Sequence, residues 1–466
     1  MTGDPSSPTA APPARDDLWH HADFLRLWAA QAISAFGSRI TRTALPIIAV
    51  ITLGQSEAIV GVLAAMQLFP GLILAILAGG MVDRGRKRRI LITADLIRAA
   101  LVASLTAAWA LGLLSEAHGT GAMLHVIVVG AGVGAATALF QITDVAYLPS
   151  LIGRRRLADG NAKLETTEAI AEITGPASAG ALIGALGAPL AVAIDAASYV
   201  WSAVMLGRIR GDARDRSERS APPPPVSDAA GAAELDAAAS AMRTGRDFQI
   251  GMHAVFGHAM VRPLVLTLML WSIVGGFFIA LYTPFCLRTI GLSERTFGVI
   301  IAMGGVGSLG GAVLGRSLAR ALGVGRTLLA TASLSLVCTL FIPIAASGTS
   351  RAMAIGFLVA HQLLGDGFSV AFVVLAVTLR QTVLPREVLG RANAAIYVST
   401  TGVLIIAAVL AGALASLIGI RAAVWIGLSI GLIAPAFLWP LRHLRNLPAG
   451  QLGASDPAIA SGESRD

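Results

Sequence analysis

Residues 79–89 read Gly-Gly-Met-Val-Asp-Arg-Gly-Arg-Lys-Arg-Arg, and this basic stretch lies between two long apolar runs. The runs are Ile59–Val82 and Ile90–Leu114. Each exceeds the ~20 residues that a helix needs to cross a bilayer. Because lysine and arginine collect in the cytoplasmic loops of membrane proteins, the stretch predicts two membrane helices joined by a short cytoplasmic loop.

The composition of the whole chain agrees with a membrane protein. Of the 466 residues, 55% are apolar and 13% are charged, whereas a soluble domain carries about 25% charged residues. This composition excludes an ordinary soluble enzyme, a disordered chain and a disulfide-rich secreted domain. The net charge of +8 comes from basic residues between apolar runs, without the basic groove of a nucleic-acid-binding surface. Cys286 and Cys338 lie inside apolar runs and indicate neither a redox nor a zinc site.

Twelve apolar runs predict an all-α membrane protein with two six-helix halves. Residues 1–22 form a polar tail predicted to be disordered, residues 208–263 a cytoplasmic linker and residues 442–466 a cytoplasmic tail. The N-terminal half, residues 23–207, holds Phe24–Leu53, Ile59–Val82, Ile90–Leu114, Met123–Tyr147, Leu164–Leu186 and Pro189–Leu206. The C-terminal half, residues 264–441, holds Leu264–Leu287, Phe297–Leu318, Thr327–Ala346, Ala352–Leu379, Ala392–Leu417 and Ala422–Leu441.

The placement of basic residues predicts the topology. With both termini in the cytoplasm, 28 of the 35 lysines and arginines fall in cytoplasmic segments. The outer loops then hold only Arg288, Arg295, Arg351 and Arg421. This asymmetry favours an even number of spans with both ends inside.

The two halves repeat one another. A shift of 232 residues carries the end of the second run, Gly79–Arg84, onto Gly311–Arg316. The same shift carries Leu157–Ala162 onto Leu389–Ala394. Two separate loops with one offset indicate a duplicated six-span unit, which is one of the designs of secondary transporters.

These residues resemble the major facilitator superfamily of membrane transporters. The stretch Gly79–Arg89 is similar to the signature loop that follows the second span in that superfamily. The chain also resembles the twelve-span drug-efflux branch that includes macrolide and enterobactin exporters. The stretches that carry this second resemblance are Asp95–Ala99, Asp144–Pro149, Leu157–Glu165 and Gly175–Gly180.

The resemblance implies two halves that rock about a site at the bilayer midplane. It also implies a cytoplasmic latch, formed by Gly79, Asp83, Arg84 and Arg88, in which Asp83 faces the N-terminal end of a helix in the other half. Two features of proton antiporters are incomplete. The arginine of the fourth span is missing from Val126–Gly130, and the fifth-span motif remains only as Gly175, Pro176 and Gly180, which we interpret as a helix bend.

Charged residues inside spans are candidates for a substrate or proton-coupling site, because each costs about 2.5–3.5 kcal/mol at the bilayer centre. The resemblance implies that spans one, four, seven and ten line a central cavity. Three of these four spans carry polar candidates: Arg39 and Arg42 in the first, Asp144 in the fourth, and His361, Gln362 and Asp366 in the tenth. Structural ion pairing between helices is the alternative interpretation.

The fifth span carries an acidic stripe. Glu165, Glu168 and Glu172 are spaced so that they share one helical face, and Glu172 lies deepest and is a candidate proton carrier. Asp95 and Arg98, three residues apart, predict a local ion pair, and Asp195 is predicted to be satisfied by a neighbouring helix. The Gly-x-Gly-x-x-Gly pattern at Gly305–Gly310 lies within a span and indicates close helix packing, not dinucleotide binding.

The sequence contains no nucleotide-binding phosphate loop, metal-ligand spacing or nucleophile elbow. We therefore expect a secondary transporter, not an enzyme, in the cell membrane, without a cofactor and as a monomer. It would export a small amphipathic compound, such as a drug, natural product or siderophore, by proton antiport. An importer of a small anionic metabolite, clamped by Arg39 and Arg42, is the alternative. A membrane-embedded enzyme acting on lipid-linked substrates and a non-transporting sensor are more remote alternatives.

Overall fold

The computed structural model describes residues 18–77, 86–153, 156–210, 245–348 and 350–445. All regular structure in these residues is helical. The N-terminal half consists of η1 (Leu18–His20), α1 (Ala22–Ile47), η2 (Ile48–Thr52), α2 (Glu57–Leu77), α4 (Lys87–Ala110), η3 (Glu116–His118), α5 (Gly119–Ile152), α6 (Leu157–Leu186) and α7 (Ala188–Gly207). The predicted N-terminal tail, most of the linker and most of the C-terminal tail lie outside the described residues.

The C-terminal half begins after a short helix, α9 (Gly245–Gly257). It consists of α10 (Val261–Pro284), η7 (Phe285–Thr289), α11 (Glu294–Leu322), α12 (Val324–Thr339), α13 (Phe341–Ala345), α14 (Arg351–Ala360), η8 (His361–Gly365), α15 (Asp366–Val383), α16 (Arg386–Ile418), α17 (Ile420–Ile430) and η9 (Gly431–His443). Within the described chain, each predicted apolar run lies on one helix or on helices that continue one another. The all-α prediction is confirmed for this part of the protein.

Ten stretches of the described chain are long and apolar enough to cross a membrane. The helices α1 and α6 are not among them, although both exceed the ~20 residues that a span requires. Both carry charged residues, Arg39 and Arg42 on α1 and three glutamates on α6. Ten of the predicted spans are therefore supported by length and composition, and the spans at α1 and α6 stay predictions.

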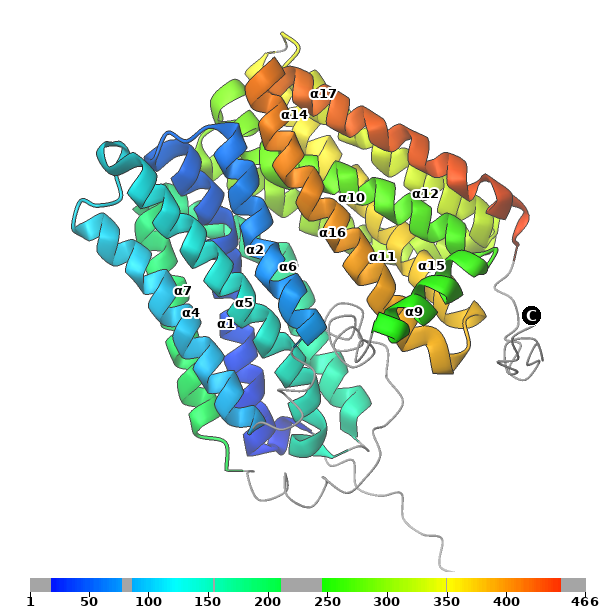
Figure 1. The fold of residues 1–466 in the computed structure, drawn as a ribbon, viewed down its shortest axis with the longest axis horizontal. Coiled ribbons are helices and arrows are strands. Elements are labelled where there is room, and N and C mark those ends of the chain that lie inside the picture. The colour runs from blue at the N-terminus through cyan, green and yellow to red at the C-terminus, as the bar shows by residue number, and fades with distance from the viewer. Residues whose placement is uncertain (1–17, 78–85, 154–155, 211–244, 349, 446–466) are drawn as a thin grey trace, which may run out of the picture.

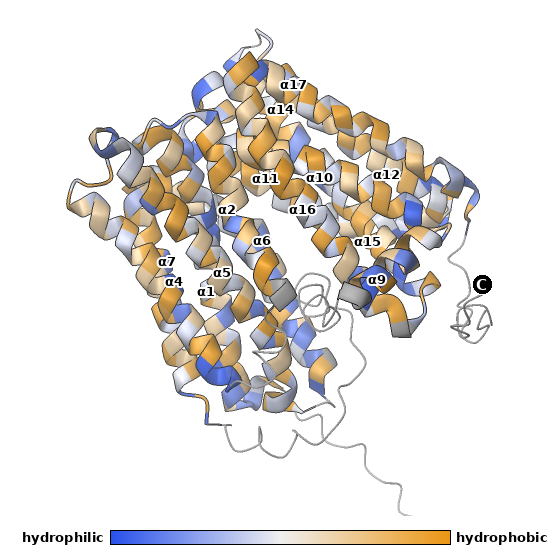
Figure 2. Cartoon of the chain, in the orientation of Figure 1, coloured by the Kyte–Doolittle hydropathy of each residue, from blue (hydrophilic) through white to orange (hydrophobic). Residues whose placement is uncertain are grey.

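The outer surface of the bundle suits a lipid environment. Large apolar side chains are exposed on many helices, for example Leu124 at 58% and Ile406 at 61%. Figure 2 shows that apolar residues dominate the helices along their length, and that hydrophilic residues gather near the helix ends. A soluble protein would not expose apolar surface to this extent.

The two halves form separate bundles that meet at one end (Figure 1). We call this the far end, where Gln55 and Glu116 lie, and the opposite end, where α7 ends and α9 begins, the basic end. Figure 1 shows the two bundles converging at the far end and diverging towards the basic end. Two antiparallel helix pairs join the halves, α2 with α16 and α6 with α11.

Glycines bring these helix pairs together. A Cβ atom placed at Gly61 of α2 would lie 2.5 Å from the carbonyl oxygen of Ala408 and 3.2 Å from Cα of Gly412, both in α16. A Cβ atom at Gly180 of α6 would touch the backbone of Gly298 in α11. Small residues at such contacts let two membrane helices approach closely.

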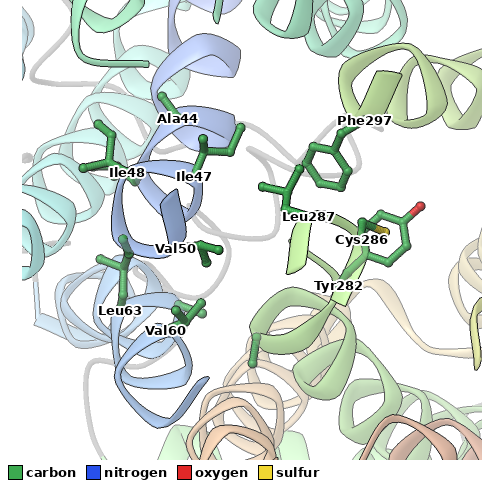
Figure 3. Close-up of a cluster of buried hydrophobic side chains, with 14 of the residues drawn as sticks. Ala44, Ile47, Ile48, Val50, Val60, Leu63, Tyr282, Cys286, Leu287 and Phe297 are labelled. Atoms are coloured by element: carbon green, nitrogen blue, oxygen red, sulfur yellow. The ribbon is translucent and has the colours of Figure 1, made fainter. Parts of the chain in front are cut away.

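A shared hydrophobic core closes the far end. Figure 3 shows Ile47 of α1 and Val50 of η2 facing Leu287 and Phe297 of the C-terminal half. All four side chains are at most 6% exposed. The halves are therefore sealed by apolar packing at the far end.

Candidate functional site

The predicted acidic stripe on α6 holds a buried arginine from α1. Arg39 is 5% exposed, and its guanidinium forms ion pairs with both Glu168 and Glu172. The two glutamate side chains are 58% and 56% exposed. A Cβ atom at Gly175 would lie 2.6 Å from Cγ of Arg39, so only glycine leaves room for this arginine. The structure thus supports ion pairing between helices for Arg39.

Arg42 lies one turn further along α1 and differs from Arg39. Its side chain is exposed, and the described residues give it no ion pair or hydrogen bond. It interacts electrostatically with Arg39, Glu172 and Glu168. The two arginines do not form the matched pair that the sequence suggests, because Arg39 is paired with two carboxylates and Arg42 with none.

Asp144 of α5 faces α1. Its carboxylate Oδ1 accepts a hydrogen bond of 2.6 Å from Nε2 of Gln31, and the residue is half-buried. No lysine or arginine among the described residues forms an ion pair with it. The amide donor stabilises the charge only in part, because a neutral hydrogen bond is weaker than an ion pair supported by hydrogen bonds.

The tenth span is interrupted by a π-helical turn that carries two of its three candidates. His361 and Gln362 lie in η8 and are each 3% exposed. The His361 ring lies inside the C-terminal half, with Nδ1 3.1 Å from the carbonyl oxygen of Cys338 and the ring near Phe278 and Tyr282. The Gln362 oxygen Oε1 has no hydrogen-bond partner in the described structure.

Asp366 follows this turn directly, and its carboxylate lies against α11. A Cβ atom at Gly304 would contact Oδ2 of Asp366 and would lie 3.5 Å from Cδ of Gln362. The described residues give Asp366 no hydrogen bond and no ion pair. Glu172 of the opposite half acts electrostatically on it.

The predicted fifth-span motif serves packing. The helix α6 is continuous through Gly175 and Pro176, so the predicted bend stays a prediction. Gly180 contacts Gly298 of the other half. The glycines of α11 likewise serve close helix packing, because a Cβ atom at Gly307 would lie 2.7 Å from the carbonyl oxygen of Gln362. The packing interpretation of Gly305–Gly310 is thus supported at Gly307, whereas a Cβ atom at Gly310 would have nothing within 4 Å.

A second polar network lies inside the N-terminal half. The predicted pair of Asp95 and Arg98 is confirmed as an ion pair at 0% and 4% side-chain exposure. Sequence analysis missed its surroundings. The hydroxyl of Ser202 donates to Asp95 over 2.6 Å, and the Arg98 guanidinium lies 4.5 Å and 4.4 Å from the ring centres of Phe140 and Tyr199.

The prediction for Asp195 is also confirmed. Its carboxylate accepts hydrogen bonds from Thr41 of α1 and, over 3.0 Å, from Ser198 on its own helix. Asp195 and Thr41 are both buried. Asp195 thus fastens α7 to α1 and does not face a cavity.

Three of the four predicted latch residues, Gly79, Asp83 and Arg84, lie outside the described residues. Arg88 is described, and its Nε donates over 2.8 Å to the carbonyl oxygen of Leu206, with a further bond to that of Gly207. Arg88 therefore caps the end of α7 within its own half. The latch itself stays a prediction.

The far end holds a contact between the halves that sequence analysis missed. Arg288 of η7 donates to the carbonyl oxygens of Gln55 and Val50 over 2.7 and 2.6 Å. Its guanidinium also lies 3.6 Å from the carboxylate of Glu57. The only signal in the sequence was that Arg288 is one of few basic residues in the predicted outer loops.

The described residues contain no cluster of histidine, cysteine and acidic side chains that could hold a metal ion. The site contains charged side chains midway along the helices of both halves. A helical bundle with lipid-compatible surfaces and such charges defines an integral membrane protein of the transporter class. The chain belongs to the Major Facilitator Superfamily, whose sequence profile matches residues 27–398.

Solved structures with this fold include transporters of different substrates. A bacterial homologue of the iron transporter ferroportin in the inward-facing state is 16% identical, with a TM-score of 0.68 over 90% of this chain and 98% of the other. A bacterial homologue of ferroportin in the outward-facing state gives a TM-score of 0.53 at 17% identity, over 90% of this chain and 99% of the other.

Two further transporters are similar. A bacterial homologue of the human lysosomal transporter Spinster is 15% identical, with a TM-score of 0.64 over 91% of this chain and 97% of the other. The nucleoside transporter NupG is 11% identical, with a TM-score of 0.64 over 90% and 99%. None of the curated proteins compared with the chain matches it.

Proposed function

We propose that this transporter exports a small amphipathic organic compound across the cell membrane by alternating access, driven by proton antiport. The observation that carries the proposal is the set of acids at mid-bundle on both sides of the boundary between the halves. Glu172 and Asp144 belong to the N-terminal half, and Asp366 belongs to the C-terminal half. Acids so placed can bind and release protons as the halves move.

The membrane topology is part of this proposal. We place the basic end in the cytoplasm, because basic residues favour that side, and we place both termini there. The helices α1 and α6 would then complete twelve spans, with Arg39 of α1 paired to Glu168 and Glu172 of α6. The protein would act as a monomer without a cofactor.

Alternating access requires one end of the boundary to open while the other closes. Far-end contacts of Arg288, Gly61 and Gly180 support a state closed on the outside and open to the cytoplasm. The higher TM-score to the inward-facing ferroportin homologue is consistent with this state. In the opposite state the far-end contacts would break and the predicted latch at Asp83 would form.

The amphipathic character of the substrate is supported by the two faces next to the boundary. On α6, Glu168 and Glu172 are exposed. On α11, Val306, Leu309 and Val313 are exposed at 48%, 58% and 68%. A polar wall beside an apolar wall favours a compound with both characters, such as a drug, natural product or siderophore.

The alternative, import of an anion held by Arg39 and Arg42, has less support. The guanidinium of Arg39 is committed to two carboxylates. Only Arg42 is left to bind an anion, and one arginine does not make a clamp.

Accumulation assays test the proposal. The chain is expressed in an efflux-deficient bacterial host, and uptake of macrolides, dyes and catecholate siderophores is measured with and without a protonophore. We expect lower accumulation that the protonophore reverses. Lower accumulation that the protonophore leaves unchanged would contradict proton antiport, and substrate uptake that depends on Arg42 would favour the importer.

A further inference from the structure

The acids at mid-bundle differ in the partners that the protein gives them. Glu168 and Glu172 pair with Arg39, and Asp144 accepts a hydrogen bond from Gln31. Asp366 has neither a basic partner nor a hydrogen-bond donor among the described residues. A half-buried carboxylate in this situation is costly as an anion, because neither water nor protein fully compensates its charge.

Next to Asp366 lies a hydrogen-bond acceptor that has no donor, the side-chain oxygen of Gln362. The Gln362 side chain is 3% exposed, and its oxygen Oε1 has no partner. Gln362 and Asp366 are four residues apart, and both side chains approach the same point over Gly304. A buried carbonyl oxygen without a donor is unfavourable, and a protonated carboxyl group at Asp366 would supply the missing donor.

The helix register places this pair at the boundary between the halves. Gly180 contacts Gly298, and a Cβ atom at Gly184 would lie 3.0 Å from Cβ of Arg295. Because α6 and α11 run antiparallel, the same register brings Glu172 level with about Val306, next to Gly304. The electrostatic interaction between Glu172 and Asp366 agrees with this placement.

The other titratable groups around Asp366 are already engaged or lie away from it. On α10, Tyr282 interacts electrostatically with Asp366 and lies beside the buried thiol of Cys286. In η8, His361 is bound to the Cys338 carbonyl oxygen of α12. On α11, the residue that lies against Asp366 is Gly304, which carries no titratable group. Arg380 lies near the other end of α15. Glu172 is the acid that faces Asp366 from the other half.

We propose that Asp366 is the proton-binding group of this transporter, and that its protonated carboxyl group donates a hydrogen bond to Oε1 of Gln362. A hydronium ion transfers its proton to the carboxylate oxygen, so that one O–H bond forms on Asp366, one O–H bond of hydronium breaks and a water molecule is left. The biological purpose of the site rests on the proposed proton antiport, but proton binding itself does not.

Infrared spectroscopy of the purified protein tests the proposal without any substrate. A protonated carboxyl group has a C=O stretching band that a carboxylate lacks, and all 27 acidic residues of the chain contribute to a difference spectrum between acid and alkaline pH. The contribution of Asp366 is the band that is present in the wild-type difference spectrum and absent from that of Asp366→Asn, and we expect one such band. In Glu172→Gln the band should persist, because the carboxyl group that gives it belongs to Asp366.

A second variant keeps the test valid if Asp366→Asn does not fold. In Gln362→Leu the band should move to higher frequency, because the carboxyl group loses its acceptor. Asp144→Asn is the matched control and should leave the band in place. A band that persists in Asp366→Asn, or that disappears in Asp144→Asn, would overturn the assignment.

The result separates this site from the proposed function. Loss of the band in Asp366→Asn, together with transport that a protonophore leaves unchanged, would support the site and contradict antiport. Protonophore-sensitive transport with an unchanged band in Asp366→Asn would support antiport and overturn the site.

Discussion

The guanidinium of Arg288 donates a 2.6 Å hydrogen bond to the backbone carbonyl oxygen of Val50, across the boundary between the two halves. Val50 lies in the π-helical turn η2 that ends the first helix, and Arg288 lies in η7, the π-helical turn that ends α10. Carbonyl groups at the end of a helix have no partner within the helix. Arg288 thus caps a helix of the opposite half and joins the two halves at the far end.

Replacement of Arg288 by alanine should open the far end more often. We expect a loss of roughly 1–2 kcal/mol from the closed state, which corresponds to a roughly five- to thirty-fold population shift. The measurement is labelling of Leu287→Cys, in a background with Cys286→Ser and Cys338→Ser, by a thiol reagent that does not cross the membrane. Leu287 is 6% exposed and faces the N-terminal half, so it reacts only when the halves part (Figure 3).

Arg351→Ala is the matched control for this experiment. Arg351 also lies at the far end, but it contacts the Gly291 carbonyl oxygen over 3.4 Å within its own half. Its labelling rate should equal that of the parent. Equal rates in Arg288→Ala and Arg351→Ala would show that the Arg288 contact does not hold the far end closed.

Loss of Arg98 should destabilise the N-terminal half. Arg98→Leu leaves Asp95 buried without its cation, and breaking a buried pair in this way costs about 3–5 kcal/mol. The double variant Asp95→Leu/Arg98→Leu should recover much of that loss. Thermal unfolding in detergent measures both effects, with the exposed Arg421→Leu as control. If Arg98→Leu unfolds at the same temperature as Arg421→Leu, the pair does not stabilise the fold.

The polar networks show which contacts a sequence can predict. Asp95 and Arg98 are three residues apart on one helix, so helical geometry alone pairs them. The spacing of Glu168 and Glu172 likewise predicts a stripe. It does not predict their partner, because Arg39 is 129 residues away from Glu168 and the pairing depends on how α1 packs against α6.

The features that sequence analysis missed involve the backbone. Arg288 binds carbonyl oxygens, which every residue carries, so no side-chain pattern marks its partners. The π-helical turns η2, η7 and η8 have no distinct composition, and the continuous apolar runs gave no sign of them. The span lengths, by contrast, follow from hydropathy alone, because the bilayer fixes how many apolar residues are needed.

Gly175 should not tolerate a side chain while Arg39 is present. A Cβ atom there would lie 2.6 Å from Cγ and 2.9 Å from Cβ of Arg39, and such overpacking costs about 1–3 kcal/mol. Gly175→Ala should therefore lower the unfolding temperature. Gly310→Ala, where nothing lies within 4 Å of the added atom, is the control and should not. In an Arg39→Gly background, which lacks both of these atoms, the cost of Gly175→Ala should vanish, and a cost that persists there would show that the clash is with another residue.

The turn between α9 and α10 should lose stability as the pH falls. The Nδ1 atom of His258 accepts a 3.2 Å hydrogen bond from the backbone N–H of Met260, which requires the neutral ring. Burial lowers the pKa of His258 below its ordinary value of 6.5. As the pH falls, the unfolded turn therefore binds a proton at higher pH than the folded turn does. The stabilisation is complete above pH 6.5 and is lost as the pH falls towards the folded-state pKa.

Hydrogen exchange of the Met260 amide, corrected for intrinsic rates, should show protection that decreases as the pH falls. His258→Asn keeps an acceptor that does not titrate, so its protection should stay constant; a parallel decrease in that variant would assign the effect to another group.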